Sequence, residues 1–176
     1  MKPLIRIGIP MLALALVAAS GARAATTGTA NVTLAATANA MVDVLDPTIT
    51  LSPTATDYTN DYVEAAGASG LRVRVKTNSS TGLALLVRCA DAVPQITLAD
   101  LLVRTQTASP TGSTTMGSYA AITSSNQTLW SMTTAQQTWL TVTTDVRVQN
   151  LINYNDAITA GPTNYTNTLT YTVVAQ

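Results

Sequence analysis

Apolar and polar residues alternate along residues 30–45, near the start of the chain. The odd positions are mostly polar, whereas the even positions are all apolar: Val32, Leu34, Ala36, Ala38, Ala40, Val42 and Val44. Because successive side chains of a strand point to opposite faces, this period of two predicts a β-strand. The segment is longer than an ordinary strand of about 5 to 6 residues. It therefore either bends across two sheets of one domain or leaves its own domain to complete a neighbour's.

The same alternation recurs along the rest of the chain. The clearest pair of strands is 71–76 and 83–89, and the turn residues at 78–82 between them are typical of a hairpin. Further strands are predicted at 48–51, 62–63, 95–105, 119–123, 127–132, 140–148 and 165–173, and loops at 57–61, 65–70 and 108–118. About eight to ten short strands in one domain predict an all-β fold, a two-sheet antiparallel β-sandwich.

Residues 1–24 have the features of a signal peptide. Lys2 and Arg6 precede a short apolar run at 7–19, and Ala22-Arg23-Ala24 matches a cleavage site. That run is too short to span a membrane and no second one follows, so we expect an exported mature chain without a membrane span. The predicted organisation is 1–24 signal peptide, 25–45 extended N-terminal strand and 46–176 β-sandwich domain.

The composition narrows the classes of function. Charged residues make up 10% of the 176 residues, against about 25% in an ordinary domain. Three of the nine basic residues leave with the signal peptide, so the mature chain is mildly acidic and nucleic acid is not an expected partner. The chain contains 32 Thr, a residue that fits the half-exposed face of a sheet. This combination favours an extracellular all-β protein.

Catalytic and metal-binding chemistry find little support. The chain has no His, so a Ser-His or Cys-His nucleophile pair is excluded, and no spacing among the nine acidic residues singles out a carboxylate pair. We therefore expect no enzyme activity, no catalytic residues and no cofactor. Asp57, Asn60, Asp61 and Glu64 offer oxygen ligands for calcium, but they match no calcium-loop spacing, and no metal site is expected.

Several single residues carry two interpretations. Cys89, the one cysteine, alternates with inward positions, which favours a buried thiol over a link between subunits. Trp130 and Trp139 are interpreted as core anchors, with stacking on sugars as the alternative. A positive ladder along one strand is interpreted as ordinary surface charge, with a patch for acidic glycans as the alternative; its members are Arg72, Arg74 and Lys76.

Three stretches carry a resemblance to a known family. They are the alternating segment 31–44 after the signal peptide, the strand-turn-strand at 73–85 and the ending at 161–173. Together they resemble exported bacterial fimbrial-type β-sandwich subunits, in particular the spore-coat-U-like and related pilin domains assembled by donor-strand exchange. In that family the N-terminal segment docks in a groove of the next subunit. The resemblance implies an immunoglobulin-like, pilin-type sandwich whose residues 30–40 form the donor strand.

These observations predict a structural subunit of an extracellular, cell-surface filament. Its N-terminal strand is expected to insert into the neighbouring subunit and to carry five side chains into that subunit's core: Val32, Leu34, Ala36, Ala38 and Ala40. The expected partners are copies of the same chain and an export chaperone. The alternative is a monomeric secreted module that binds a glycan or serves in adhesion.

The first prediction concerns the cleavage site. We expect the exported chain to begin at Ala25, because Ala22 and Ala24 provide the small residues that signal peptidase requires. Intact-mass measurement of the secreted protein tests this. Retention of Met1 in the secreted form would contradict the prediction.

Overall fold

The computed structural model describes residues 33–34, 36–105, 113–154 and 164–176. The chain divides into two units, Met1–Ala35 and Ala36–Gln176. In the first unit the described residues are Thr33 and Leu34, which are exposed and lie in no helix or strand. The predicted signal peptide and Val32 lie outside the described residues. The second unit holds the sandwich and begins before the predicted domain boundary at residue 46.

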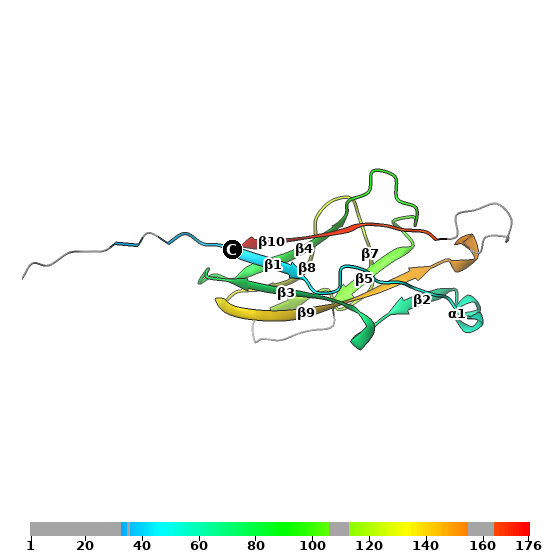
Figure 1. Ribbon diagram of the computed structural model, residues 1–176, viewed down its shortest axis with the longest axis horizontal. Coiled ribbons are helices and arrows are strands. Elements are labelled where there is room, and N and C mark those ends of the chain that lie inside the picture. The colour runs from blue at the N-terminus through cyan, green and yellow to red at the C-terminus, as the bar shows by residue number, and fades with distance from the viewer. Residues whose placement is uncertain (1–32, 35, 106–112, 155–163) are drawn as a thin grey trace, which may run out of the picture. The chain divides into compact units, whose positions relative to one another are not determined.

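Two antiparallel sheets form the second unit (Figure 1). Among the described residues, the large sheet has six strands in the order β1-β3-β9-β5-β7, with β2 paired to β9, and the small sheet has four in the order β10-β4-β8-β6. The large-sheet strands are β1 (Ala40–Val44), β2 (Tyr62–Ala65), β3 (Leu71–Thr77), β5 (Leu101–Thr105), β7 (Ala120–Ala121) and β9 (Gln136–Gln149). The small-sheet strands are β4 (Leu83–Cys89), β6 (Ser113–Thr115), β8 (Gln127–Met132) and β10 (Leu169–Ala175). The predicted all-β two-sheet sandwich is confirmed.

Alternating side chains from both sheets form the core. Trp130 of β8 is fully buried, together with inward residues of four strands: Val73, Val75, Leu83, Leu85, Val87, Leu129 and Val142. Burial of one such side chain is worth about 1.5 to 3 kcal/mol. The predicted alternation is confirmed at Val73 and Val142, which are buried whereas their neighbours Arg72 and Thr141 are exposed. Asp145 of β9, which the alternation places outward, is fully buried.

The predicted hairpin between 71–76 and 83–89 is wrong in its pairing. β3 pairs with β1 and β9 in the large sheet, whereas β4 pairs with β10 and β8 in the small sheet. The turn at 78–82 thus carries the chain from one sheet to the other. Gly82 permits this with φ +91°, and a Cβ there would lie 1.9 Å from the carbonyl oxygen of Met132. Alternation predicts which face of a strand is buried, but it does not predict the partner strand.

Two other predictions fail between β1 and β2. The predicted strand 48–51 forms no strand; Ile49 and Leu51 contact the core from an irregular segment between prolines. The predicted loop 57–61 is largely the helix α1 (Ala55–Asn60). Thr54 caps this helix, since its hydroxyl accepts from the Asp57 N–H while the Asp57 carboxylate accepts from the Thr54 N–H.

The remaining predictions hold in part. β2 and β8 occur where strands were predicted, and β9 is longer than predicted. The strands predicted at 95–105 and 119–123 contract to β5 and β7, and the strand predicted at 165–173 begins and ends later, as β10. The predicted loop 65–70 contains the short 3-10 helix η1 (Gly67–Ser69), and a second one, η2 (Leu151–Tyr154), follows β9. In the predicted loop 108–118, residues 106–112 lie outside the described part and β6 occupies Ser113–Thr115.

The second prediction concerns Cys89, which is 1% exposed on the inward face of β4. Burial raises the pKa of its thiol, and the carboxylate of Asp91, whose Oδ2 accepts from Sγ at 3.5 Å, raises it further. We expect Cys89 to resist a thiol reagent in the native protein and to react after unfolding, because only the thiolate is the nucleophile. Time-resolved labelling followed by mass spectrometry tests this. Rapid labelling of the native protein would contradict this prediction. A disulfide-linked dimer that a reducing agent converts to monomers would also contradict it.

Candidate functional site

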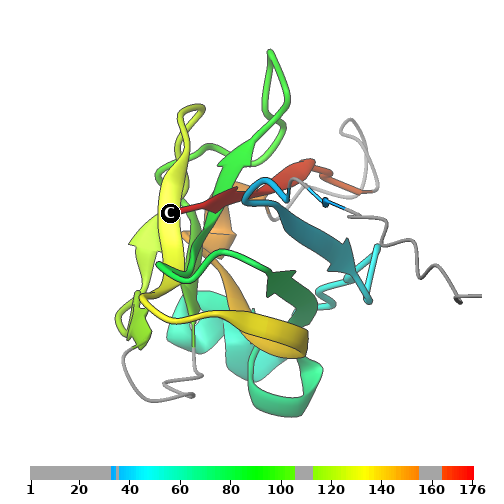
Figure 2. The same ribbon diagram turned by 90° about the vertical axis from the view of Figure 1, so that its left-hand side faces the viewer.

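The free edges of β1 and β10 lie beside each other on one side of the sandwich (Figure 2). β1 is the terminal strand of the large sheet and pairs with β3, while β10 is the terminal strand of the small sheet and pairs with β4. Within the described chain, no ladder joins β1 to β10. We call these two free edges the β1/β10 margin. Such edges present main-chain donors and acceptors that another strand can satisfy.

Apolar side chains at the β1/β10 margin are incompletely covered. On β10, the half-buried residues are Leu169, Tyr171 and Val173, and on β1 they are Ala40 and Val42; all five pack against the core. Their partners one strand further in are almost fully buried: Val75, Thr77, Leu85, Val87 and Cys89. The burial falls off at this margin because no strand of the described chain pairs with the outer edges of β1 and β10.

The five residues predicted for the polymerisation strand separate into three groups. Val32 lies outside the described residues. Leu34 is 88% exposed, and Ala36 and Ala38 are also exposed and in no strand. Ala40 instead belongs to β1, where it pairs with Thr77. The described residues before Ala40 thus form no strand within their own chain, and Ala40 is half-buried in its own sandwich. The strand that these residues are expected to form with a neighbouring copy stays a prediction.

Asn78, in the turn between the sheets, holds the chain that precedes β1. Its Nδ2 donates to the carbonyl of Thr37 at 2.9 Å, and its Oδ1 accepts from the N–H of Asn39 at 2.6 Å. The Asn78 N–H also donates to the carbonyl of Asn39 at 3.2 Å. The exposed segment that precedes these contacts therefore ends at Ala36. This role of Asn78 was not predicted from the sequence, since asparagine is also common in turns for purely local reasons.

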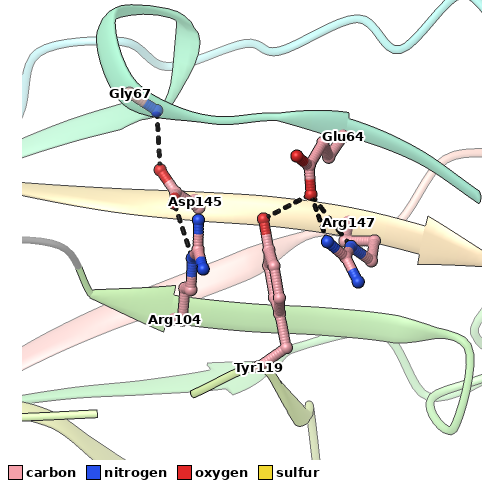
Figure 3. A network of polar contacts seen from close by, with 6 residues as sticks. All are labelled: Glu64, Gly67, Arg104, Tyr119, Asp145 and Arg147. Atoms are coloured by element: carbon pink, nitrogen blue, oxygen red, sulfur yellow. Dashed lines mark hydrogen bonds and ion pairs between the residues drawn. The ribbon is translucent and has the colours of Figure 1, made fainter. Parts of the chain in front are cut away.

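The outer face of the large sheet carries a cluster of paired charges (Figure 3). Arg147 of β9 donates to Oε2 of Glu64 on β2 from Nε at 2.9 Å and from Nη2 at 2.6 Å. Tyr119, which precedes β7, donates its hydroxyl to the same oxygen at 2.8 Å. The guanidinium carbon of Arg147 lies 4.0 Å from the ring centroid of Tyr119, a favourable cation–π distance. These contacts join β2, β9 and the residue before β7.

A second ion pair extends the same cluster. Asp145 of β9 is fully buried and accepts from Nε of Arg104 at 2.8 Å and from the N–H of Gly67 at 2.9 Å. The guanidinium of Arg104 lies 4.5 Å from the ring centroid of Tyr119. Because an uncompensated buried carboxylate is costly, these donors stabilise the folded sheet. The cluster thus has the contacts of a structural network.

The ionisation of the cluster follows from these contacts. Burial opposes ionisation of Glu64, but the hydrogen bonds from Arg147 and Tyr119 outweigh it and lower the pKa of the carboxyl. Burial, with the hydrogen bond to Glu64, raises the pKa of the Tyr119 hydroxyl to about 12. Both groups therefore keep the protonation states that their hydrogen bond requires across the physiological range.

The structure separates the other predicted site residues. In the described chain, no group of three or more His, Cys, Asp or Glu side chains could hold a metal ion. Asp57 caps α1 and Glu64 pairs with Arg147, so the calcium alternative finds no assembled ligands. Trp130 is a core anchor as predicted, but Trp139 is 37% exposed, and its predicted core role is wrong.

The positive ladder on β3 is mostly neutralised. Arg72 pairs with Asp46 at 2.8 Å, and Arg74 pairs with Asp43 at 2.7 Å. Both acidic residues belong to the chain that runs beside β3, so the ladder binds β1 and the residues after it to the sheet. Lys76 forms no ion pair with a described acidic residue.

Comparisons with known proteins leave the family of this chain open. No family model, no curated protein and no solved structure matches it. Among the described residues, no helix is long and apolar enough to cross a membrane.

The third prediction concerns the hydroxyl of Tyr119. We expect Tyr119→Phe to lower the free energy of unfolding by about 1 kcal/mol at pH 7, because it removes a hydrogen bond to a charged acceptor. Since the folded pKa of Tyr119 is raised to about 12, this contribution is fully present below the ordinary value of 10 and is lost as the pH rises through 12. The difference between wild type and variant should therefore shrink above pH 10.

Urea unfolding of both proteins from pH 7 to 11.5 measures this difference. The other tyrosines are common to both proteins, so their ionisation cancels. Equal stability at pH 7, or a difference that grows with pH, would contradict the structural role of the hydroxyl.

Proposed function

We propose that the chain is an exported structural subunit of a cell-surface filament, and that its N-terminal segment completes the sandwich of a neighbouring copy. The observation that carries this proposal is the β1/β10 margin, where apolar residues of both sheets are half-buried beside free edges. The segment that precedes Asn39 supports it as the occupant, because Leu34 and Ala36 are exposed and occupy every second position, between the polar residues Thr33 and Thr37. A structural role needs no catalytic residue, cofactor or metal.

The length of the segment suits this role. Residues 25–36 precede the Asn78 contacts in the predicted mature chain and span about 40 Å when extended. The β10 edge has seven residues, or about 23 Å. The segment can therefore cover the β10 edge and still leave a short connection between subunits. Val32, Leu34 and Ala36 would lie on the inward face, while Ala38 and Ala40 stay with the donating subunit.

The directions of the strands favour an open chain of subunits. β1 begins, and β10 ends, at the turn 78–82, because Ala40 pairs with Thr77 and Ala175 pairs with Leu83. A donor strand antiparallel to β10 would begin near the turn 78–82 of the acceptor. It would end at the other end of the acceptor's sandwich, where α1 and η2 lie. The donating subunit would then sit beyond that end with its own turn 78–82 facing the acceptor. Repetition of such a heterologous contact gives a filament instead of a closed dimer.

The fourth prediction tests the donor segment with two matched charge insertions. Leu34→Asp places a charge on the inward face of the proposed strand, whereas Thr33→Asp places the same charge on its outward face. We expect Leu34→Asp to abolish filaments. At each contact between two subunits it removes the burial of a Leu side chain, which is worth about 1.5 to 3 kcal/mol, and it buries a carboxylate instead. Thr33→Asp should assemble normally. Negative-stain imaging and sedimentation of the mature proteins measure assembly.

A truncation supplies an independent control. Protein that lacks residues 25–36 should form no filaments, and a peptide with the sequence of residues 25–36 should bind it and raise its melting temperature. The same peptide with Leu34→Asp should have no effect. Filaments of unchanged form from the truncated protein, or identical behaviour of the two aspartate variants, would refute the proposed donor segment.

A further inference from the structure

A shallow groove lies on the large sheet at the end where β1 begins. Its volume is about 380 Å³, and its lining residues are Asn39, Met41, Lys76, Thr77, Asn78 and Gln137. This volume falls within the range of about 300 to 1,000 Å³ that small-molecule sites occupy. The pairing of β3 with β9 is irregular between Val75 and Thr77, so the strand edge at the groove departs from a regular ladder. This surface is separate from the half-buried inward residues of the β1/β10 margin.

Lys76 gives the groove a positive charge that the described chain does not neutralise. Four of the six basic residues after the predicted signal peptide form ion pairs with N–O distances of 2.6 to 2.8 Å. Lys76 has no such pair with a described acidic residue. The acidic residue in the adjacent row of the sheet, Asp43, is paired with Arg74 at 2.7 Å. Of the two basic residues without such a pair, Lys76 and Arg88, Lys76 is the one that lines the groove.

Trp139 lies beside this charge and is partly open to solvent. The Nζ of Lys76 lies 4.6 Å from the Trp139 ring centroid, and Cζ of Arg74 lies 4.7 Å from it. These cations hold the indole on the outer face of the sheet, where it remains 37% exposed, whereas Trp130 is fully buried. Met41, opposite Lys76 on β1, is 48% exposed. Apolar surface and a positive charge thus occur together.

We propose that this groove binds an acidic sugar unit of a polysaccharide, such as a hexuronate. Its carboxylate would pair with the ammonium of Lys76. The apolar C–H face of its ring would extend beyond the lining residues to the exposed part of Trp139, which lies beside Lys76. The carboxamides of Asn39 and Gln137 line the groove and can both donate to and accept from sugar hydroxyls. The uncompensated charge favours an acidic sugar over a neutral one. This site does not depend on the proposed filament.

The fifth prediction is tested with trigalacturonic acid as the probe. Trp139 should report binding as a saturable change in fluorescence, while the buried Trp130 provides a constant background. We expect Lys76→Gln, which keeps most of the side-chain stem, to weaken binding about 5-fold, in line with the loss of an exposed ion pair. Trp139→Ala should abolish binding, measured by titration calorimetry because the reporter is lost.

Two controls separate this site from general charge effects. Arg88 lies on the outward side of β4, in the other sheet, and likewise has no ion pair with a described acidic residue, so Arg88→Gln removes one positive charge away from the groove. Arg88→Gln should leave the affinity for the probe unchanged. As the second control, the methyl ester of the probe should bind wild type as weakly as the acid binds Lys76→Gln. Circular dichroism melting curves confirm that the variants are folded.

The proposal is overturned if wild type shows no saturable binding to the probe, or if Lys76→Gln and Arg88→Gln reduce the affinity equally. Equal affinity for the acid and its methyl ester would also overturn the acidic specificity. The donor-segment experiments alter residues 33, 34 and 25–36, outside the groove. Failure of either proposal is therefore distinguishable from failure of the other.

Discussion

The turn at 78–82 is the constraint on which most of the sandwich depends. It moves the chain from the large sheet to the small sheet, and Gly82 allows a backbone conformation there that a side chain would block. Its polar residues also hold two distant segments: Asn78 binds the chain before β1, and the hydroxyls of Ser79 and Thr81 donate to the carbonyl of Gln176 after β10. The strands β1 and β10 are thereby fixed at neighbouring edges.

The few charged residues of the chain are mostly used in ion pairs of the large sheet. Four ion pairs on the large sheet join segments that are distant in sequence, such as β2 with β9 and β5 with β9. Exposed pairs contribute little individually, but Asp145 is buried and its loss would leave Arg104 and Gly67 without their acceptor. The charged residues of this otherwise neutral, Thr-rich protein therefore lie at positions where they join segments that are distant in sequence.

The sequence predicted the fold class and the faces of the strong strands, because alternation depends only on local geometry. It could not predict that β3 and β4 lie in different sheets, since partner choice depends on contacts across the whole domain. The spacing of Thr54 and Asp57 is a helix-capping signal, yet the polar composition of 57–61 favoured a loop, so the helix was not predicted. For the candidate site, the alternation found Leu34 and Ala36, but the half-burial of Tyr171 and the contacts of Asn78 depend on which strands lie at an edge.

The far edges of the two sheets have a different character. The large sheet ends there in β7, a strand of two residues, and the small sheet ends in β6, a strand of three. Strands this short offer few main-chain groups to an incoming chain, so they disfavour sheet-to-sheet stacking between molecules. In the described chain the longer terminal strands, β1 and β10, therefore offer more main-chain groups to an incoming strand than β6 and β7 do. Under the proposed strand donation, this asymmetry favours association along a line over growth into stacked sheets.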